Sequence, residues 1–215
     1  MVSQRVHLVR HGEVENPNGL LYERLPGFGL SERGREMARL AAEDLASRGI
    51  RATKLVVSPL ERTRESAQPI AELMGLEPEL DERVIEPWNR FAGKKVGGRY
   101  GAVRRPANWR HLVNPLTPSW GEPYAEIAAR MKESILEWTA AAEGGDVIVV
   151  THQLPIWMVH LRLRGAPLVH DPRHRRCALS SITDFEYHPA TGLVEVDYRE
   201  PAAPLLAGTV DEGAV

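Results

Sequence analysis

The sequence predicts an α/β protein: a three-layer α/β/α sandwich around a mainly parallel sheet with an antiparallel C-terminal edge. Three observations predict this fold class. Short β-prone apolar runs alternate with amphipathic helical stretches from residue 6 to residue 165, which is the order of parallel strands joined by crossover helices. Val147-Ile148-Val149-Val150 is an uninterrupted β-branched run, as expected of a strand buried on both faces. After residue 181 the chain alternates around a turn at 189–192 and predicts a hairpin.

The length of 215 residues is enough for one domain, which we expect to span residues 1–200, followed by a loose Pro-, Ala- and Gly-rich tail at 201–215. With 43% hydrophobic residues, the chain can form a core without disulfides or structural metals. The formal net charge of −2 argues against nucleic-acid and anionic-membrane partners. The single cysteine, Cys177, excludes an internal disulfide, and no apolar stretch approaches the roughly 18 residues of a membrane span. We therefore expect a soluble, cytoplasmic protein.

The first half of the chain predicts two strand–helix units. The first strand ends at Arg10-His11-Gly12, where glycine and the polar residues after it stop the apolar run. Ser31 is a helix N-cap residue, and Pro69 is expected to kink the second helix. The expected elements, in order, are a strand at 6–9, a functional loop at 13–30, a helix of about 16 residues from Ser31 to Gly49, a strand at 55–59 and a helix at 60–74.

The second half predicts a third strand, an insertion and two further strand–helix units. The insertion is Pro- and Gly-rich and lacks periodicity, and we expect it to form a cap over the site. The expected elements are a short apolar run at 84–85, the insertion at about 87–121, a helix at 122–142, a strand at 147–151, a helix of about ten residues ending at Gly165, and a hairpin at 182–198.

Polar residues follow three of these apolar runs directly. Arg10 and His11 follow the first strand, Glu86 follows the third run, and His152 follows the β-branched strand. In open parallel sheets the carboxyl ends of the strands lie at one edge, where ligands bind. These residues are therefore expected to meet in one crevice.

The order of these motifs resembles the histidine phosphatase superfamily, which includes the cofactor-dependent phosphoglycerate mutases. The resemblance covers roughly residues 5–190. Leu8-Val9-Arg10-His11-Gly12-Glu13 is its most specific part, and Arg62 in Ser58-Pro59-Leu60-Glu61-Arg62-Thr63 and His152 complete the ordered set. It implies a phosphoryl-transfer enzyme whose intermediate is a phosphohistidine.

The same roles follow from the chemistry of a phosphate monoester. The ester is anionic, so a catalyst must neutralise charge on the phosphoryl oxygens and present an uncharged nucleophile. Nearby cations keep an imidazole deprotonated, so we expect His11 to attack, while Arg10, Arg62 and His152 bind the oxygens. The resemblance places the general acid at Glu86, a few residues before Gly93. Glu82 is the competing candidate.

Further residues around these motifs are expected to bind substrate. Gly12, Glu13, Asn16, Asn18 and Tyr22 follow the nucleophile along the functional loop, and Glu13 is also a candidate to assist the acid. Gln153 follows the second histidine, where the family usually has glycine, and its amide either replaces or obstructs a backbone contact. The pocket is expected to bind phosphate or sulfate.

The departures from the mutase pattern favour a phosphatase. The aromatic-Asn pair and the Thr-Gly-Trp segment of the mutases are not recognisable in residues 13–30. We therefore expect a phosphoric monoester hydrolase of the histidine acid phosphatase type that acts on a small phosphorylated substrate. A phosphoglycerate mutase-type transferase is the first alternative, and a non-catalytic phosphoryl-binding regulator, indicated by Gln153, is the second. Sugar phosphates, phosphoglycerates, nucleotides and phosphoproteins are all possible substrates.

No metal site and no cofactor are expected. The run from His170 to Cys177 contains His170, Asp171, His174 and Cys177, whose His-x3-His spacing can bind zinc on a helix. Pro172 breaks such a helix, and the arginines at 173, 175 and 176 repel a cation. The sequence therefore predicts a metal-independent reaction.

Overall fold

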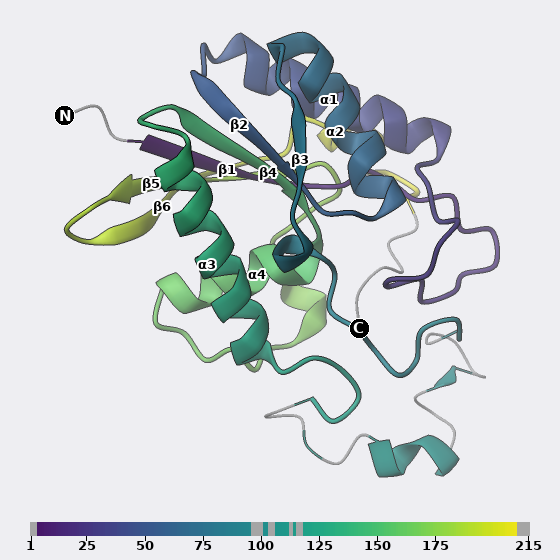
Figure 1. The fold of residues 1–215 in the computed structure, drawn as a ribbon. Helices are drawn as coiled ribbons and strands as arrows, with labels where there is room; N and C mark the ends of the chain where they lie inside the picture. Colours follow the sequence, from purple (N-terminus) through teal and green to yellow (C-terminus); the bar gives the residue numbers. More distant parts are fainter. Residues whose placement is uncertain (1–3, 96–100, 103–105, 112–113, 115–117, 210–215) are drawn as a thin grey trace.

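One six-stranded sheet runs through the centre of the protein in the order β3-β2-β4-β1-β5-β6 (Figure 1). It is seen in a computed structural model that describes residues 4–95, 101–102, 106–111, 114 and 118–209. The strands are β1 (Gln4–Arg10), β2 (Ala52–Val57), β3 (Pro78–Leu80), β4 (Asp146–Thr151), β5 (Ile182–His188) and β6 (Gly192–Arg199). The first four are parallel to one another, whereas β5 is antiparallel to β1 and β6 to β5. The predicted fold class is confirmed, including the C-terminal hairpin.

Two pairs of helices cover the two faces of the sheet (Figure 1). They are α1 (Glu32–Ser47), α2 (Glu61–Met74), α3 (Tyr124–Ala141) and α4 (Gln153–Leu163). Ser31 caps α1 as predicted, because its Oγ accepts a hydrogen bond from the backbone N–H of Gly34 (3.0 Å). Pro69 lies inside α2, and the chain stays helical from Glu61 to Met74.

The alternation of side chains along the strands divides the core into two layers. Val9, Leu55 and Ile148 point toward α1 and α2, whereas Val6 and Val149 point toward α3 and α4. All five are fully buried or nearly so. Burial on both faces explains why β1, β2 and β4 read as continuous apolar runs rather than as alternating ones.

The third strand lies earlier than predicted. β3 is Pro78–Leu80, and the buried Val84 instead ends a 3₁₀ turn, η1 (Glu82–Val84). Val84 is apolar because its side chain packs in the core, not because the residue pairs in the sheet. Its backbone carbonyl accepts a hydrogen bond from Thr151 Oγ1 (2.5 Å). β3 is an edge strand with Leu80 exposed, so it lacks the apolar signature of a buried strand.

The first residues of the predicted tail are packed rather than loose. Ala202 is fully buried against Met37 and Leu179, and residues Ala203–Leu205 form a 3₁₀ turn. This apolar contact fixes the chain against α1 after β6 ends. Residues 210–215 lie outside the described part of the chain.

The predicted insertion at 87–121 is joined at its two ends. The backbone N–H of Glu122 donates to the carbonyl of Trp88 (3.2 Å), and that of Arg90 donates to the carbonyl of Trp120 (2.7 Å). This pairing brings the end of the insertion beside its beginning, which follows Glu86 in the chain. The remainder includes a 3₁₀ segment, Pro106–His111, while residues 96–100, 103–105, 112–113 and 115–117 lie outside the described chain.

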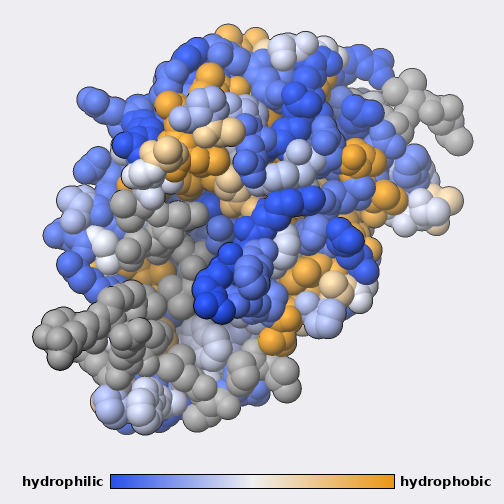
Figure 2. All heavy atoms as spheres, turned by 180° about the vertical axis from the view of Figure 1, so that it is seen from behind, coloured by the Kyte–Doolittle hydropathy of each residue, from blue (hydrophilic) through white to orange (hydrophobic). Residues whose placement is uncertain are grey.

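The described residues on the face seen in Figure 2 are mostly hydrophilic. In Figure 2, which views the molecule from behind, hydrophobic residues form separate patches between hydrophilic ones. In the described part of the chain, every helix is too short or too polar to cross a lipid bilayer.

The loop after β1 lies directly against the start of α1. A Cβ added to Gly34 would lie 2.0 Å from the carbonyl oxygen of Glu13, and one added to Gly12 would lie 2.3 Å from that of Gly34. Both contacts are with backbone, which cannot move aside cheaply. Glycine at 12 and 34 therefore lets the N-terminus of α1 support the Arg10-His11-Gly12 loop.

We predict that Gly34→Ala lowers the free energy of unfolding by about 2–3 kcal/mol, because the new methyl group overlaps the Glu13 carbonyl. Gly29→Ala is the matched control, since its Cβ would meet only the flexible carboxylates of Glu65 and Glu61. Urea unfolding of both variants and the unsubstituted protein measures the difference. Equal losses in the two variants would contradict the close-approach argument.

Candidate active site

Three neighbouring parallel strands end at one edge of the sheet, and each is followed by a polar residue of the site. The backbone N–H of His11 donates to the carbonyl of Thr151 (3.1 Å), and that of Ser58 donates to the carbonyl of Val150 (3.0 Å). His152 follows Thr151 directly. The sheet register therefore places His11 and His152, which were expected to meet, side by side, together with Ser58, which was not among the predicted site residues.

His11 is buried and uncharged. Burial is the main cause that holds its pKa well below the ordinary value, and the charges of Arg62 and Arg10 act in the same direction. Its Nδ1 lies 2.8 Å from the carbonyl oxygen of Gly12, to which the neutral ring donates its proton. The lone pair of the imidazole is therefore on Nε2, the nitrogen expected to attack.

Arg10 and Arg62 are only 1% exposed, so both guanidinium groups lie inside the protein. Nη1 of Arg10 donates to the carbonyl of Cys177 (2.6 Å), and Nη2 of Arg62 donates to the carbonyl of Glu23 (2.8 Å). Arg62 also lies over the ring of Tyr22, 4.8 Å from its centroid. In the described residues Nε of Arg62 has no acceptor. This donor is available to an anion.

His152 contacts both His11 and Glu86. Its ring centroid lies 5.2 Å from that of His11, and its Nδ1 lies 3.2 Å from Nη2 of Arg62 and 3.3 Å from Oε2 of Glu86. Its Nε2 lies 2.7 Å from Ser58 Oγ. Burial first, then the charge of Arg62, holds the pKa of His152 well below its usual range. His152 is therefore a neutral hydrogen-bonding group.

Glu86 is the carboxyl group of the site. It is 3% exposed, whereas the competing candidate, Glu82, lies on the surface. Burial raises the pKa of Glu86 to about 7, although the nearby arginines act in the opposite direction. A carboxyl group with this pKa can both give and take a proton near neutral pH.

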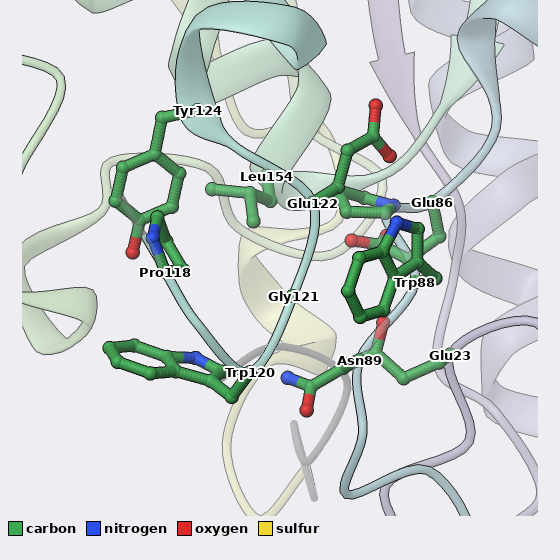
Figure 3. A pocket seen from close by; sticks show the side chains of 11 residues that line it. Glu23, Glu86, Trp88, Asn89, Pro118, Trp120, Gly121, Glu122, Tyr124 and Leu154 are labelled. Carbon is green, nitrogen blue, oxygen red and sulfur yellow. The ribbon is translucent and has the colours of Figure 1, made fainter. Parts of the chain in front are cut away.

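A cavity opens beside Glu86 (Figure 3). Trp88 and Trp120, at the two ends of the insertion, line it together with Tyr124 and Leu154. Glu23 contributes a second carboxyl group. The cavity thus adjoins the buried carboxyl group of Glu86.

The predicted substrate-binding residues of the loop have different positions. Gly12 and Tyr22 contact the centre, through His11 and Arg62 respectively. Glu13 instead accepts a hydrogen bond from Ser31 Oγ (2.8 Å) at the start of α1. Asn16 closes the loop through two hydrogen bonds with the backbone of Leu20, and Asn18 is exposed. These bonds hold Glu13 and Asn16 in place as parts of the loop.

Gln153 supports the segment before β5. Its Nε2 lies 3.4 Å from the carbonyl of Cys177, and its Oε1 accepts a hydrogen bond from Nη1 of Arg175 (3.3 Å). Arg175 also donates to Nε2 of His170 (2.7 Å), whose Nδ1 lies 2.7 Å from the carbonyl of Leu168. Both ring nitrogens of His170 are thus engaged in hydrogen bonds, which argues against a zinc site formed by residues 170–177.

Two buried charged residues of the site, Glu23 and Arg175, were not predicted. Arg175 interacts electrostatically with Glu86, Arg10 and Tyr124. The signal for Arg175 was the density of arginines in the 170–177 run, which we interpreted only as repulsion of a metal ion. Glu23 gives no comparable signal, because a glutamate in a polar loop is ordinary.

The neutral histidines predict how stability depends on pH. Below about pH 6.5 the unfolded chain binds protons on His11 and His152 that the folded protein does not bind, so this contribution to stability is lost as the pH falls. Each histidine contributes at most about 1.4 kcal/mol per pH unit. We predict that His152→Gln loses less stability than the unsubstituted protein between pH 7.5 and 5.5 in urea unfolding. The comparison is between proteins because Glu23 and Glu86, whose pKa values are raised, act in the opposite direction. Identical losses in the two proteins would contradict it.

Comparisons with known proteins agree with this geometry. The model of the histidine phosphatase superfamily (branch 1) matches residues 6–197. Rv0525 of Mycobacterium tuberculosis, described as an uncharacterized protein, is 49% identical over 199 residues, which cover 93% of this chain and 97% of the relative. Phosphoserine phosphatase 1 of Hydrogenobacter thermophilus is 32% identical over 166 residues, covering 75% and 76%. Mycobacterial glucosyl-3-phosphoglycerate phosphatase Rv2419c, solved with VO3, superposes with a TM-score of 0.72 at 24% identity, covering 90% and 97%. The chain belongs to the histidine phosphatase superfamily.

Proposed function

We propose that this protein is a metal-independent phosphomonoesterase that hydrolyses a small phosphorylated substrate through a phosphohistidine on His11. The observation that carries the proposal is the neutral imidazole of His11 beside two buried arginines, Arg10 and Arg62, and a carboxyl group, Glu86, that retains its proton near neutral pH. The arginines supply positive charge that offsets the charge of the phosphoryl group. The function needs neither metal nor cofactor, and the proposed location is the cytoplasm.

The reaction has two steps. In the first, Nε2 of His11 attacks phosphorus, the bond from phosphorus to the ester oxygen breaks, and Glu86 gives its proton to the leaving oxygen. In the second, a water molecule gives a proton to the Glu86 carboxylate and attacks the phosphohistidine, and the phosphorus–nitrogen bond breaks. Inorganic phosphate leaves, and His11 and Glu86 return to their starting states. Arg10, Arg62 and His152 donate hydrogen bonds to the phosphoryl oxygens in both steps.

The environment of the leaving group is formed by the insertion, which we propose to cap the site within the single domain. Trp88 and Trp120 support this role because both line the cavity beside Glu86. Gly12 and Tyr22 complete the phosphoryl side of the pocket, and Gln153 acts indirectly through Arg175. A bound phosphate or sulfate is expected between Arg10 and Arg62.

We predict that His11→Ala abolishes turnover, because the attacking nitrogen is removed. Brief reaction of the unsubstituted protein with a ³²P-labelled substrate, followed by denaturation, should trap phosphate that is labile in acid and stable in alkali, as a phosphohistidine is. Activity should be unchanged in EDTA and inhibited competitively by vanadate. His160→Gln, which removes a histidine bonded to Glu195 away from the site, is the control for the label. Undiminished hydrolysis by His11→Ala would contradict the proposed mechanism.

The second prediction separates hydrolysis from phosphoglycerate mutase activity. Both reactions share the first step, so only the fate of the phosphohistidine distinguishes them. We predict that phosphoenzyme is discharged to inorganic phosphate, and that Glu86→Gln slows hydrolysis most for substrates whose leaving groups are poor, because these need the proton most. Bisphosphoglycerate-primed conversion of 3-phosphoglycerate is measured beside phosphate release. Fast isomerisation with negligible phosphate would establish the mutase alternative, and binding without either reaction would establish the regulator.

A further inference from the structure

Glu23 is a buried carboxyl group that has no hydrogen-bond or ion-pair partner in the part of the chain that the structure describes. The residue is 4% exposed, and among the described residues its carboxylate makes no hydrogen bond and no ion pair. Its backbone carbonyl, by contrast, accepts a hydrogen bond from Nη2 of Arg62. A carboxyl group in this position is costly to bury in its charged form, and structural packing alone gives no reason for it.

The backbone of Glu23 is also strained. Its φ is +41°, in the left-handed region that glycine adopts without strain and other residues rarely occupy. Such conformations persist in proteins mainly at functional sites, where the surrounding structure holds them. Here Arg62 holds the carbonyl, and the side chain is directed into the cavity that Glu86 also lines (Figure 3).

The two carboxyl groups lie in one electrostatic environment. Arg62 and Arg175 interact with both of them. The other groups that face the pair are Arg10 from β1, Arg130 from α3, His152 after β4 and Arg24 from the loop before α1. Glu122 lines the same cavity, but it is neutralised by Arg130 (2.6 Å) and Arg24 (3.2 Å). Glu23 is therefore a buried carboxyl group that lines the same cavity as Glu86 and has no ion-pair partner among the described residues.

We propose that Glu23 and Glu86 form a carboxyl pair that shares one proton, and that Glu23 is a positioning residue that keeps Glu86 in its acid form. This inference rests on the proposed phosphatase function. Two carboxylates that line one buried cavity cannot both ionise cheaply, so the first proton is lost readily and the second is held. Burial and the neighbouring charge of Glu86 raise the pKa of Glu23, which agrees with such a pair.

The pair affects both steps of the reaction. Before the first step it retains the proton that Glu86 gives to the leaving oxygen. Once that proton has left, both carboxyl groups are charged, and their repulsion makes Glu86 a stronger base. Glu86 then takes a proton from the attacking water, which restores one proton to the pair. The attack of the water releases one phosphate per cycle. This favours transfer of the phosphoryl group to water.

The test is the pH dependence of kcat/KM for Glu23→Gln, which removes the charge and keeps the size of the side chain. Without the neighbouring charge Glu86 loses its proton more easily, so the alkaline limb of the profile should move to lower pH by about one unit. Glu23→Gly should give the same shift and also relieve the backbone strain. Glu23→Asp, which keeps the charge, should leave the limb near its original position. Glu195→Gln, which removes a carboxylate outside this cavity, is the control, and its limb should not move.

A second measurement does not depend on activity. In protein labelled with ¹³C at the glutamate carboxyl carbons, the signals of Glu23 and Glu86 are assigned by their absence from Glu23→Gln and Glu86→Gln. Two-step titration of both signals, and titration of Glu86 at lower pH in Glu23→Gln, would support the pair. Unchanged titration of Glu86 in that variant, or an unmoved alkaline limb, would overturn it. A protein that shows the coupled titration but hydrolyses no phosphomonoester would refute the proposed function and leave the pair intact.

Discussion

Burial of positive charge is the constraint on which the site depends. Arg10, Arg62 and Arg175 lie inside the protein, and each donates a hydrogen bond to a backbone carbonyl or to a neutral side chain. A buried guanidinium is costly unless its donors are satisfied, and here backbone carbonyls and neutral side chains satisfy only some of them. Nε of Arg62 has no acceptor among the described residues, and burial, together with these charges, holds the pKa values of His11 and His152 well below the ordinary value.

The sheet makes this arrangement rigid. Because β1, β2 and β4 are parallel neighbours in register, the residues that follow them are fixed by backbone hydrogen bonds rather than by flexible side chains. The close contact between Gly12 and Gly34 then fixes the loop that carries His11 against α1. Catalytic geometry in such a site is set by the same bonds that stabilise the fold. Changes at Gly34 are therefore expected to affect stability and activity together.

The leaving-group side is built differently. It is formed by Glu86, by the ends of the insertion and by Glu23 from the loop after β1. All of these residues lie outside the strands. Aromatic rings and carboxyl groups line the cavity there, and burial raises the pKa of Glu86. Under the proposed function, proton transfer and selection of the leaving group both take place at this cavity.

The sequence by itself determined the parallel α/β fold, because β-branched runs and helical periodicity are local signals of burial. It also predicted the positions of Arg10, His11, Arg62, Glu86 and His152, since each follows a recognisable apolar run or motif. Only the tertiary structure decided which carboxyl groups are buried. Glu82 and Glu86 look alike in sequence, and β3 lacks an apolar pattern, yet one side chain is exposed and the other lies beside His152. Glu23 and Arg175 come from loops without periodicity, so their burial depends on contacts between segments far apart in the chain, which local patterns do not encode.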